Sequence, residues 1–148
     1  MTDQNIVLDA AVGYEFPEKV IPLIELAKKS IKIIVFDWRW YPSDIGCSCQ
    51  LFNQSIIRAR KREIPISVMS NMPDVVRILK ASKISAKKPE SKRMLHSKMM
   101  IIDDEILIIG SHNYTQSAFT KNQEISVIIR AKGQLERYIS YFNKVWRS

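Results

Sequence analysis

Residues 96–113 read HSKMMIIDDEILIIGSHN, and the middle of this stretch carries the clearest structural signal in the chain. Two largely apolar runs, 98–102 and 106–109, are joined by the acidic triplet 103–105. Apolar runs of this length on either side of a short polar connection are typical of a β-hairpin whose strands are covered on both faces. The stretch therefore predicts a hairpin in the interior of a sheet.

Strand and helix patterns alternate on both sides of this hairpin. Short apolar runs predict further strands, and apolar residues at helical spacing predict helices. We expect strands at 31–36, 64–69 and 124–130, and helices at 17–30, 50–62 and 135–146. Helices interleaved with buried strands predict an α/β fold in which a mixed β-sheet is sandwiched between helices, in one domain over residues 1–148.

Three local features refine this outline. Pro22 is assigned to the first turn of the first helix, where a missing N–H costs little. Asp74 is assigned as the cap of a short helix with inward-facing apolar residues at 75–79. The stretch from Lys80 to Arg93 is rich in lysine and serine, and it predicts an exposed basic loop.

Composition limits the class of partner. The chain has 148 residues, and its 23 Lys and Arg exceed its 15 Asp and Glu, which gives a formal net charge of +8. A hydrophobic fraction of 46% and a charged fraction of 26% argue against disorder. Excess positive charge favours a nucleic acid or an anionic membrane surface. A cationic domain that binds neither fits the charge alone equally well.

The sequence offers no sign of export or of a resident metal. No apolar run approaches the roughly 20 residues that span a bilayer, and the polar start at 1–6 does not read as a signal peptide. Cys47 and Cys49 are interpreted as buried or half-buried thiols rather than zinc ligands, because the only histidines are His96 and His112. We expect a cytoplasmic protein with no membrane association.

The residues that carry chemistry flank the hairpin. His96 and Lys98 alternate along an extended chain, so their side chains project into the same space. An imidazole is a competent nucleophile or proton carrier near neutral pH, and an ammonium group beside it can hold a phosphate oxygen. Ser111 and Asn113 add hydroxyl, amide and backbone donors to the turn after the second run. Taken singly, each of these residues also has an ordinary structural interpretation.

The spacing H-x-K-x4-D-x6-G-S-x-N resembles the signature of the phospholipase D superfamily, and the resemblance extends from about Pro17 to Trp146. It implies the phospholipase D-like fold, no metal or other cofactor, and a phosphohistidine intermediate formed on His96. Lys98 and Asn113 would neutralise the non-bridging oxygens. Ser111 is mainly a turn residue with a possible phosphate contact, and for Asp103 a catalytic role and a hydrogen-bonding role that holds the motif both stay open.

The segment Lys121-Asn122-Gln123-Glu124 resembles the one that follows the motif in the family's small bacterial nucleases. There a glutamate orients the nucleophilic histidine, and Glu124 is the matching residue. The mechanism needs two imidazoles, and His112, at the variable position of G-S-x-N, is expected at the rim and pointing away. The resemblance therefore implies a homodimer that shares one active site between two copies of His96.

Two groups of residues are candidates for contact with nucleic acid. A basic group enters the motif directly, and an aromatic group with one arginine follows the first predicted strand. They are Lys87, Lys88, Lys92 and Arg93, and Trp38, Arg39 and Trp40. The alternatives are a solvated charged face for the first group and packing in the core or a dimer interface for the aromatic residues.

These observations lead to one favoured function and two alternatives. The favoured function is a metal-independent phosphodiesterase, an endonuclease that cleaves DNA or RNA. The first alternative is an enzyme of phospholipase D type that hydrolyses a phospholipid. The second is a nucleic-acid-binding module without catalysis, which the complete signature argues against.

Overall fold

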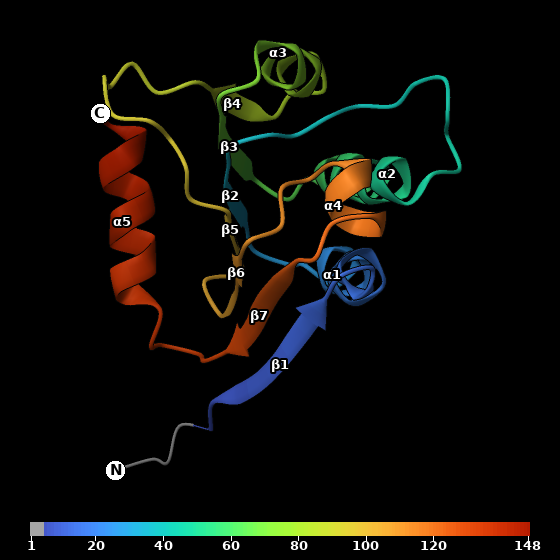
Figure 1. Ribbon diagram of the computed structural model, residues 1–148. Coiled ribbons are helices and arrows are strands. Elements are labelled where there is room, and N and C mark those ends of the chain that lie inside the picture. The colour runs from blue at the N-terminus through green and yellow to red at the C-terminus, as the bar shows by residue number, and fades with distance from the viewer. Residues whose placement is uncertain (1–4) are drawn as a thin grey trace.

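The computed structural model describes residues 5–148, which form a seven-stranded sheet with helices on both faces (Figure 1). The strand order is β1-β7-β6-β5-β2-β3-β4. The strands are β1 (Val7–Val12), β2 (Ile31–Val35), β3 (Ile66–Ser70), β4 (Ser85–Lys87), β5 (Met99–Ile102), β6 (Ile106–Gly110) and β7 (Ile125–Arg130). The helices are α1 (Glu15–Glu25), α2 (Ser48–Lys61), α3 (Pro73–Ala81), α4 (Gln116–Thr120) and α5 (Glu136–Trp146).

The predicted hairpin lies at the centre of this sheet. β5 and β6 pair antiparallel, with Met99 opposite Ile109 and Ile102 opposite Ile106. Asp103 and Asp104 turn the chain with φ values of 57° and 54°, a left-handed conformation that aspartate tolerates better than most residues. β2, β3 and β4 run parallel to one another, whereas β5 runs antiparallel to β2, so the sheet is mixed as predicted.

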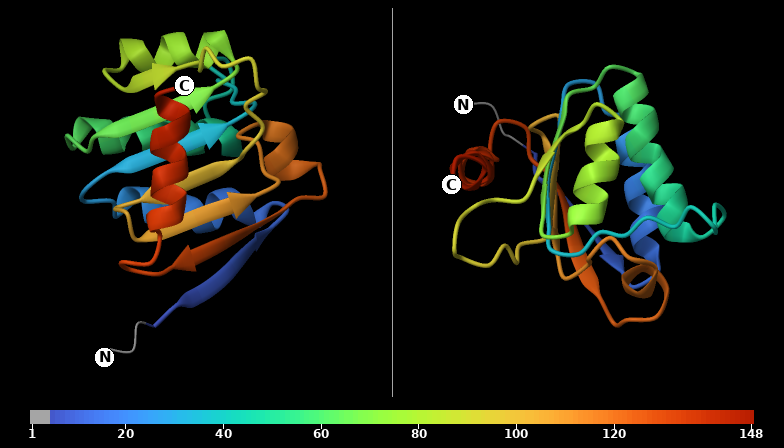
Figure 2. Two further views of the ribbon diagram at one scale, coloured as in Figure 1. Left: turned by 90° about the vertical axis from the view of Figure 1, so that its left-hand side faces the viewer. Right: turned by 90° about the horizontal axis from the view of Figure 1, so that it is seen from above.

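The two faces of the sheet are covered unequally. Figure 2 shows α5 crossing one face of the sheet, while α1, α2, α3 and α4 lie on the opposite side. Alternate residues of the central strands divide between two cores: Met100 and Ile108 pack with Phe52 in the larger one, and Met99 packs with Phe142 of α5 in the smaller one. The arrangement confirms the prediction of a mixed sheet between helices.

Several predicted boundaries are wrong for identifiable reasons. α1 begins at Glu15, so Pro17 occupies its first turn and Pro22 lies inside the helix. Asp74 does not cap α3, because the helix begins one residue earlier and its N-cap is Met72, without a side-chain hydrogen bond. Asp74 instead lies in the first turn, where its carboxylate pairs with Arg77 at 3.2 Å.

The predicted basic loop contains regular structure. α3 extends to Ala81, and β4 pairs with β3, with Ser85 opposite Ser67. The edge strand β1 and the short helix α4 were not predicted. Residues 1–4, on which the expectation about a signal peptide largely rests, lie outside the described residues. Within residues 5–148, no helix combines the length and the apolar character needed to cross a membrane.

Gly110 ends β6 where that strand lies unusually close to β7. A Cβ atom placed on Gly110 would lie 2.4 Å from the carbonyl oxygen of Ile125 and 2.4 Å from the Cα of Ser126. Both are backbone atoms, so no side-chain rotation can relieve the contact. The glycine of the motif is therefore required by strand packing, and it brings the chain after β6 close to the start of β7.

We expect Gly110→Ala to lower the free energy of unfolding by about 3 kcal/mol, because the strands must separate to admit the methyl group. Urea denaturation measures this change. Gly46→Ala is the matched control, since no atom lies within 4 Å of the Cβ position at Gly46. Equal stability of the two variants would contradict the explanation.

Candidate active site

Most of the catalytic candidates lie within a few positions of the same end of the central strands β5 and β6. Lys98 directly precedes the first residue of β5, and its carbonyl accepts a hydrogen bond from the N–H of Gly110 at 3.3 Å. Gly110 in turn lies opposite Ser126 of β7. The other candidates lie in the three segments that adjoin these strand ends. His96 precedes β5, Ser111 and Asn113 follow β6, and Glu124 precedes β7.

Asn113 is fixed by the strand on the other side of β5. Its Oδ1 atom accepts a hydrogen bond from the backbone N–H of Asp37 at 3.1 Å. The N–H of Tyr114 donates to the carbonyl of Asp37 at 3.0 Å, and Trp38 and Tyr114 form an isolated parallel bridge. Because the amide oxygen is occupied by Asp37, the two N–H donors of the Asn113 side chain remain for an anionic ligand.

This pairing also explains why His96 and Lys98 are accessible. β5 lies between β2 and β6, so the extensions of β2 and β6 can pair only where the β5 chain has left the sheet. The carbonyl of Lys98 still pairs with Gly110, so the part of the chain that leaves the sheet is the one before it, which contains His96 and Ser97. His96 is exposed and Lys98 is half-buried. The centre of the Phe36 ring lies 5.5 Å from the centre of the His96 imidazole.

The side chains of His96 and Lys98 converge as the alternation predicts. The Lys98 Nζ atom donates to the carbonyl of His96 at 3.0 Å and lies 3.5 Å from its Nδ1 atom. An ammonium group in this position can bind an anion beside the ring. Imidazole, ammonium and amide donors thus lie on adjoining segments, which is an arrangement suited to phosphoryl transfer.

Ser111 fastens the turn after β6 to β7. Its backbone N–H donates to the carbonyl of Ile125 at 3.0 Å, while its Oγ atom accepts from the N–H of Ile125 at 3.0 Å and donates to its carbonyl. This is the turn role that the sequence favoured for Ser111. Contact of its hydroxyl with a phosphate stays a prediction.

Glu124 is half-buried just before β7, and its carboxylate accepts a hydrogen bond from the amide of Asn122 at 3.1 Å. No hydrogen bond joins Glu124 to His96 among residues 5–148. The orientation of His96 by this glutamate therefore stays a prediction.

Asp103 lies away from the other candidates, at the opposite end of β5. Its carboxylate accepts hydrogen bonds from the backbone N–H groups of Lys28, Lys29 and Ser30, the shortest at 2.6 Å. Its own N–H donates to the carbonyl of Ser30 at 2.8 Å. The structure thus supports the hydrogen-bonding role and does not bring Asp103 to the imidazole.

His112 is not at the rim, and that expectation was wrong. The residue is 1% exposed, and its ring lies 4.5 Å from the ring of Phe16. Its Nε2 atom lies 2.9 Å from the carbonyl of Gly13, which can only accept, so Nε2 is the donor and Nδ1 accepts from the Ser126 hydroxyl at 2.8 Å. Burial lowers the pKa of His112 below 6.5. Both nitrogens of this imidazole are committed to the fold.

The aromatic candidates for nucleic-acid contact are mostly packed inside. Trp38 is 1% exposed, and its Nε1 donates to Asn53 at 2.6 Å, so it cannot stack on a base. Trp40 is half-buried against Trp38, with ring centres 6.3 Å apart. Arg39 is exposed, but its guanidinium pairs with Asp37 at 3.0 Å. Core packing, the alternative weighed for these aromatic residues, is correct for Trp38.

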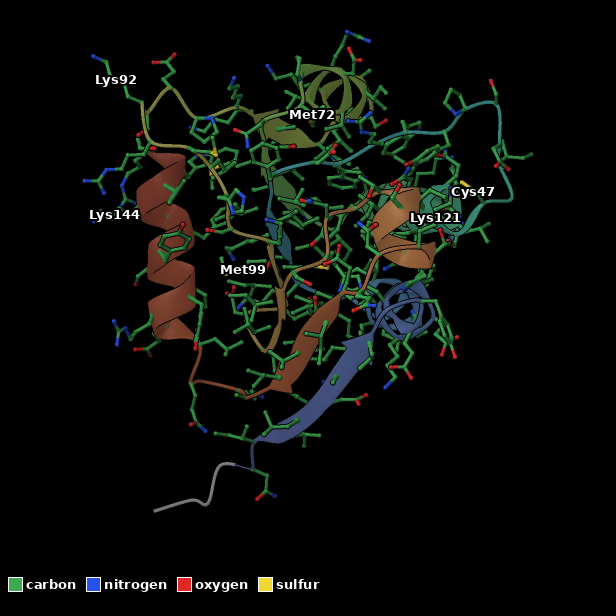
Figure 3. The ribbon with its side chains drawn as sticks, viewed as in Figure 1. Cys47, Met72, Lys92, Met99, Lys121 and Lys144 are labelled. Atoms are coloured by element: carbon green, nitrogen blue, oxygen red, sulfur yellow. The ribbon has the colours of Figure 1, made fainter. Side chains whose placement is uncertain are left out.

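The basic candidates differ among themselves. Lys88, Lys92 and Arg93 are exposed on the segment between β4 and β5, where Figure 3 labels Lys92. Lys87 is half-buried, because its ammonium donates to the carbonyl of Trp146 and lies 4.3 Å from the centre of that ring. Lys87 therefore also ties β4 to α5.

Three residues around the site were missed. Phe36 and Asp37 follow the carboxyl end of β2, and the rule that ligands bind at carboxyl ends of parallel strands could have drawn attention to them. The Tyr141 hydroxyl lies 2.7 Å from the Ser97 hydroxyl, between the two motif residues. No local sequence pattern predicts this contact, because it joins α5 to a loop 44 residues earlier in the chain.

The cysteines are buried to the extent expected of thiols, and they form no disulfide with each other. Cys49 is buried in α2, Cys47 is half-buried, and Figure 3 labels Cys47 beside this helix. Burial raises the pKa of the Cys49 thiol, so it stays protonated at neutral pH. Among the described residues, no three His, Cys, Asp or Glu side chains gather as metal ligands would.

The mixed sheet carries an imidazole, an ammonium and an amide at one end of its central strands, an arrangement suited to phosphoryl transfer. Residues 20–146 match the family model described as "Cardiolipin synthase, PLD-like domain". The chain therefore belongs to the phospholipase D-like family. The resemblance that the motif suggested is thus confirmed over most of the chain.

Individual relatives are distant. The mitochondrial cardiolipin hydrolase of Canis lupus familiaris is 23% identical over 120 residues, which cover 81% of this chain and 46% of that protein. The chain thus spans about half the length of this curated relative.

Two solved structures share the fold over nearly their whole length. Nuc from Salmonella typhimurium, a phospholipase D family member, superposes with a TM-score of 0.80 at 20% identity, covering 97% of this chain and 95% of Nuc. NucT from Helicobacter pylori gives a TM-score of 0.77 at 19% identity, covering 97% and 98%. At sequence identities of 20% and 19%, these structural similarities establish the shared fold alone.

We expect Asp103→Ala to lower the free energy of unfolding by about 3 kcal/mol, because it removes the side-chain acceptor of three backbone N–H bonds from a left-handed position. Asp104→Ala carries the same backbone strain but loses only partly exposed ion pairs with Lys29 and Lys32, so it should cost less. Chemical denaturation of both variants checks the order, and a smaller loss for Asp103→Ala would refute it.

His112 gives the stability a defined pH dependence. Its folded pKa lies below 6.5, so as the pH falls from about 6.5 the unfolded chain takes up a proton that the folded chain resists. Stability therefore falls below that pH, by at most about 1.4 kcal/mol per pH unit from this group. The decline should be shallower in His112→Gln, as measured by urea denaturation in buffers from neutral to mildly acidic pH. Parallel profiles would refute the assignment.

Proposed function

We propose that this protein is a metal-independent phosphodiesterase that cleaves nucleic acid through a phosphohistidine intermediate, with an active site completed by a second copy of the chain. The observation that carries the proposal is the convergence of Lys98 on His96, together with an Asn113 amide, on an adjoining segment, whose oxygen is already occupied. Membership of the phospholipase D-like family supports a hydrolase that acts on phosphodiesters.

The reaction proceeds in two displacements. A ring nitrogen of His96 attacks phosphorus, a P–N bond forms, and the P–O bond to the leaving group breaks. A second imidazole donates a proton to the departing oxygen, and it then accepts a proton from the water that cleaves the P–N bond. The Lys98 ammonium and the Asn113 N–H groups stabilise charge on the non-bridging oxygens throughout.

The source of the second imidazole follows from the histidine count. The chain has 2 histidines, and both ring nitrogens of buried His112 are held by Gly13 and Ser126. His112 therefore cannot reach a substrate in the folded state. We infer that the second imidazole is His96 of another copy, related by a twofold axis.

An exposed apolar strip next to the site offers a surface for this association. Val12 of β1 lies opposite Ile125 of β7, and they are 52% and 55% exposed. Leu8 and Val127 extend the strip at 71% and 40% exposure. Contiguous apolar surface of this kind is typical of protein interfaces. The strip begins next to Ser111 and Glu124, so a partner bound here lies close to the motif.

Nucleic acid is the favoured substrate because of the charge of +8 and the exposed cations that precede His96. A phospholipid is the second candidate, since one relative is named a mitochondrial cardiolipin hydrolase. Both substrates contain a phosphodiester, so the chemistry above serves either.

We expect the purified protein to cleave DNA or RNA in excess EDTA, and His96→Ala to lose more than about 10³-fold of the rate. Gel assays of labelled oligonucleotides measure both. Far-ultraviolet circular dichroism of the variant controls for folding. A strict requirement for Mg²⁺ would contradict the mechanism, and release of phosphatidic acid from vesicles without nuclease activity would favour the phospholipid. Binding without turnover would indicate a non-catalytic module.

Mixing the two proteins tests the shared site. After random subunit exchange between equal amounts of wild type and His96→Ala, about one quarter of the dimers retain both imidazoles, so activity should fall below the half that independent sites would give. Native mass measurement establishes the dimer separately. Activity at one half, or a monomer that is fully active, overturns the composite site.

A further inference from the structure

A basic groove lies at the far edge of the sheet from the apolar strip. It encloses about 780 Å³ between α3 and the segment that follows β4, and we call it the α3–β4 groove. Its lining contains four cationic side chains, Arg77, Lys80, Lys87 and Lys88, and one carboxylate, Glu90. Pro73, Val76 and Pro89 supply apolar wall. A concave surface with this excess of positive charge concentrates anions.

The cations of the groove differ in how far they are already engaged. Lys87 is held by Trp146, and Arg77 forms an ion pair with Asp74 in which both side chains are more than 70% exposed, so the pair is weak. Lys80 and Lys88 are exposed, and neither forms an ion pair among residues 5–148. These two lysines are therefore free to meet an incoming anion.

A second hollow connects the groove to the catalytic segment. It encloses about 370 Å³ between α5 and the loop before His96, and it shares Pro89 and Ser148 with the first. Arg93, Lys144 and Tyr141 line it. Figure 3 shows Lys92 and Lys144 projecting outward where this loop passes the C-terminal end of α5. Through its hydrogen bond to Ser97, Tyr141 links this hollow to the motif.

The groove lies too far from the motif to hold the reacting phosphate. β4 is separated from β5 by β2 and β3, and three strand spacings amount to roughly 14 Å. A ligand that occupies both places must therefore carry several phosphates along its length. A nucleic-acid strand meets this requirement, whereas the flat headgroup layer of a membrane does not enter a concave groove.

We propose that the α3–β4 groove is an exosite for the phosphate backbone of nucleic acid, in which Lys80 and Lys88 bind phosphates remote from the bond that is cleaved. The inference rests on the proposed function for its substrate class. It adds Lys80 of α3, outside the loop before His96, to the substrate contacts.

The test compares Lys80→Gln/Lys88→Gln with Lys28→Gln/Lys61→Gln. The second pair removes the same charge from exposed lysines outside the groove. Binding of a labelled oligonucleotide is measured by fluorescence anisotropy in the His96→Ala background, which separates binding from cleavage. We expect the groove pair to weaken binding about tenfold and to lower the slope of log Kd against log salt by roughly 1 per lysine. The control pair should change both quantities much less.

Steady-state kinetics of cleavage provide a second, independent test of the exosite. In the otherwise wild-type chain, the groove pair should raise KM for a long oligonucleotide and leave kcat, and turnover of a small chromogenic phosphodiester, unchanged. Equal effects of the two pairs, or loss of binding to phosphatidylglycerol vesicles but not to the oligonucleotide, overturns the exosite. If the wild type binds nucleic acid through Lys80 and Lys88 but does not cleave it, the proposed function fails and the groove stands.

Discussion

The site depends on one pairing interaction, between the chain that follows β2 and the chain that follows β6, at the end of the sheet where β5 begins. The backbone of Asp37 holds both the Asn113 side chain and the N–H of Tyr114. Since these two segments pair with each other, the chain before Lys98, which contains His96, is displaced from the sheet and accessible to a ligand. The same few hydrogen bonds therefore fix the amide and leave the imidazole and ammonium free, and a rigid sheet rather than a flexible loop sets their relative positions.

The two ends of the β5–β6 hairpin have different tasks. At one end the Asp103 carboxylate binds three backbone N–H groups of the chain before β2, and it holds the hairpin in register. At the other end Gly110 allows β6 to approach β7 closely, and Ser111 fastens the following turn to Ile125. The motif thus combines residues that position the hairpin with residues proposed to face a ligand, which explains why a single spacing pattern spans both.

The sequence predicted the parts of the molecule that local pattern determines. The hairpin, strands β2, β3 and β7, and helices α1, α2 and α5 follow from apolar periodicity, and the convergence of His96 with Lys98 follows from alternation. β1 was missed because an edge strand can mix exposed and buried residues. The burial of His112 was missed because it depends on Phe16 and Ser126, which lie far from it in the sequence, whereas core packing of Trp38 was one of the two alternatives that its sequence left open. The groove was missed because the stretch from Lys80 onward was predicted as an exposed loop, whereas it contains the end of α3 and the strand β4.

The commitment of His112 to the core has a consequence for how such a protein responds to dilution. On the proposed mechanism, a chain with one usable imidazole has no internal substitute, so its two-imidazole reaction would decline as copies dissociate at low concentration. Joining two copies in tandem on one polypeptide would remove that dependence without altering a single side chain at the site, because the linker would keep the halves at a high effective concentration. Freed from the need to be identical, the halves could then diverge.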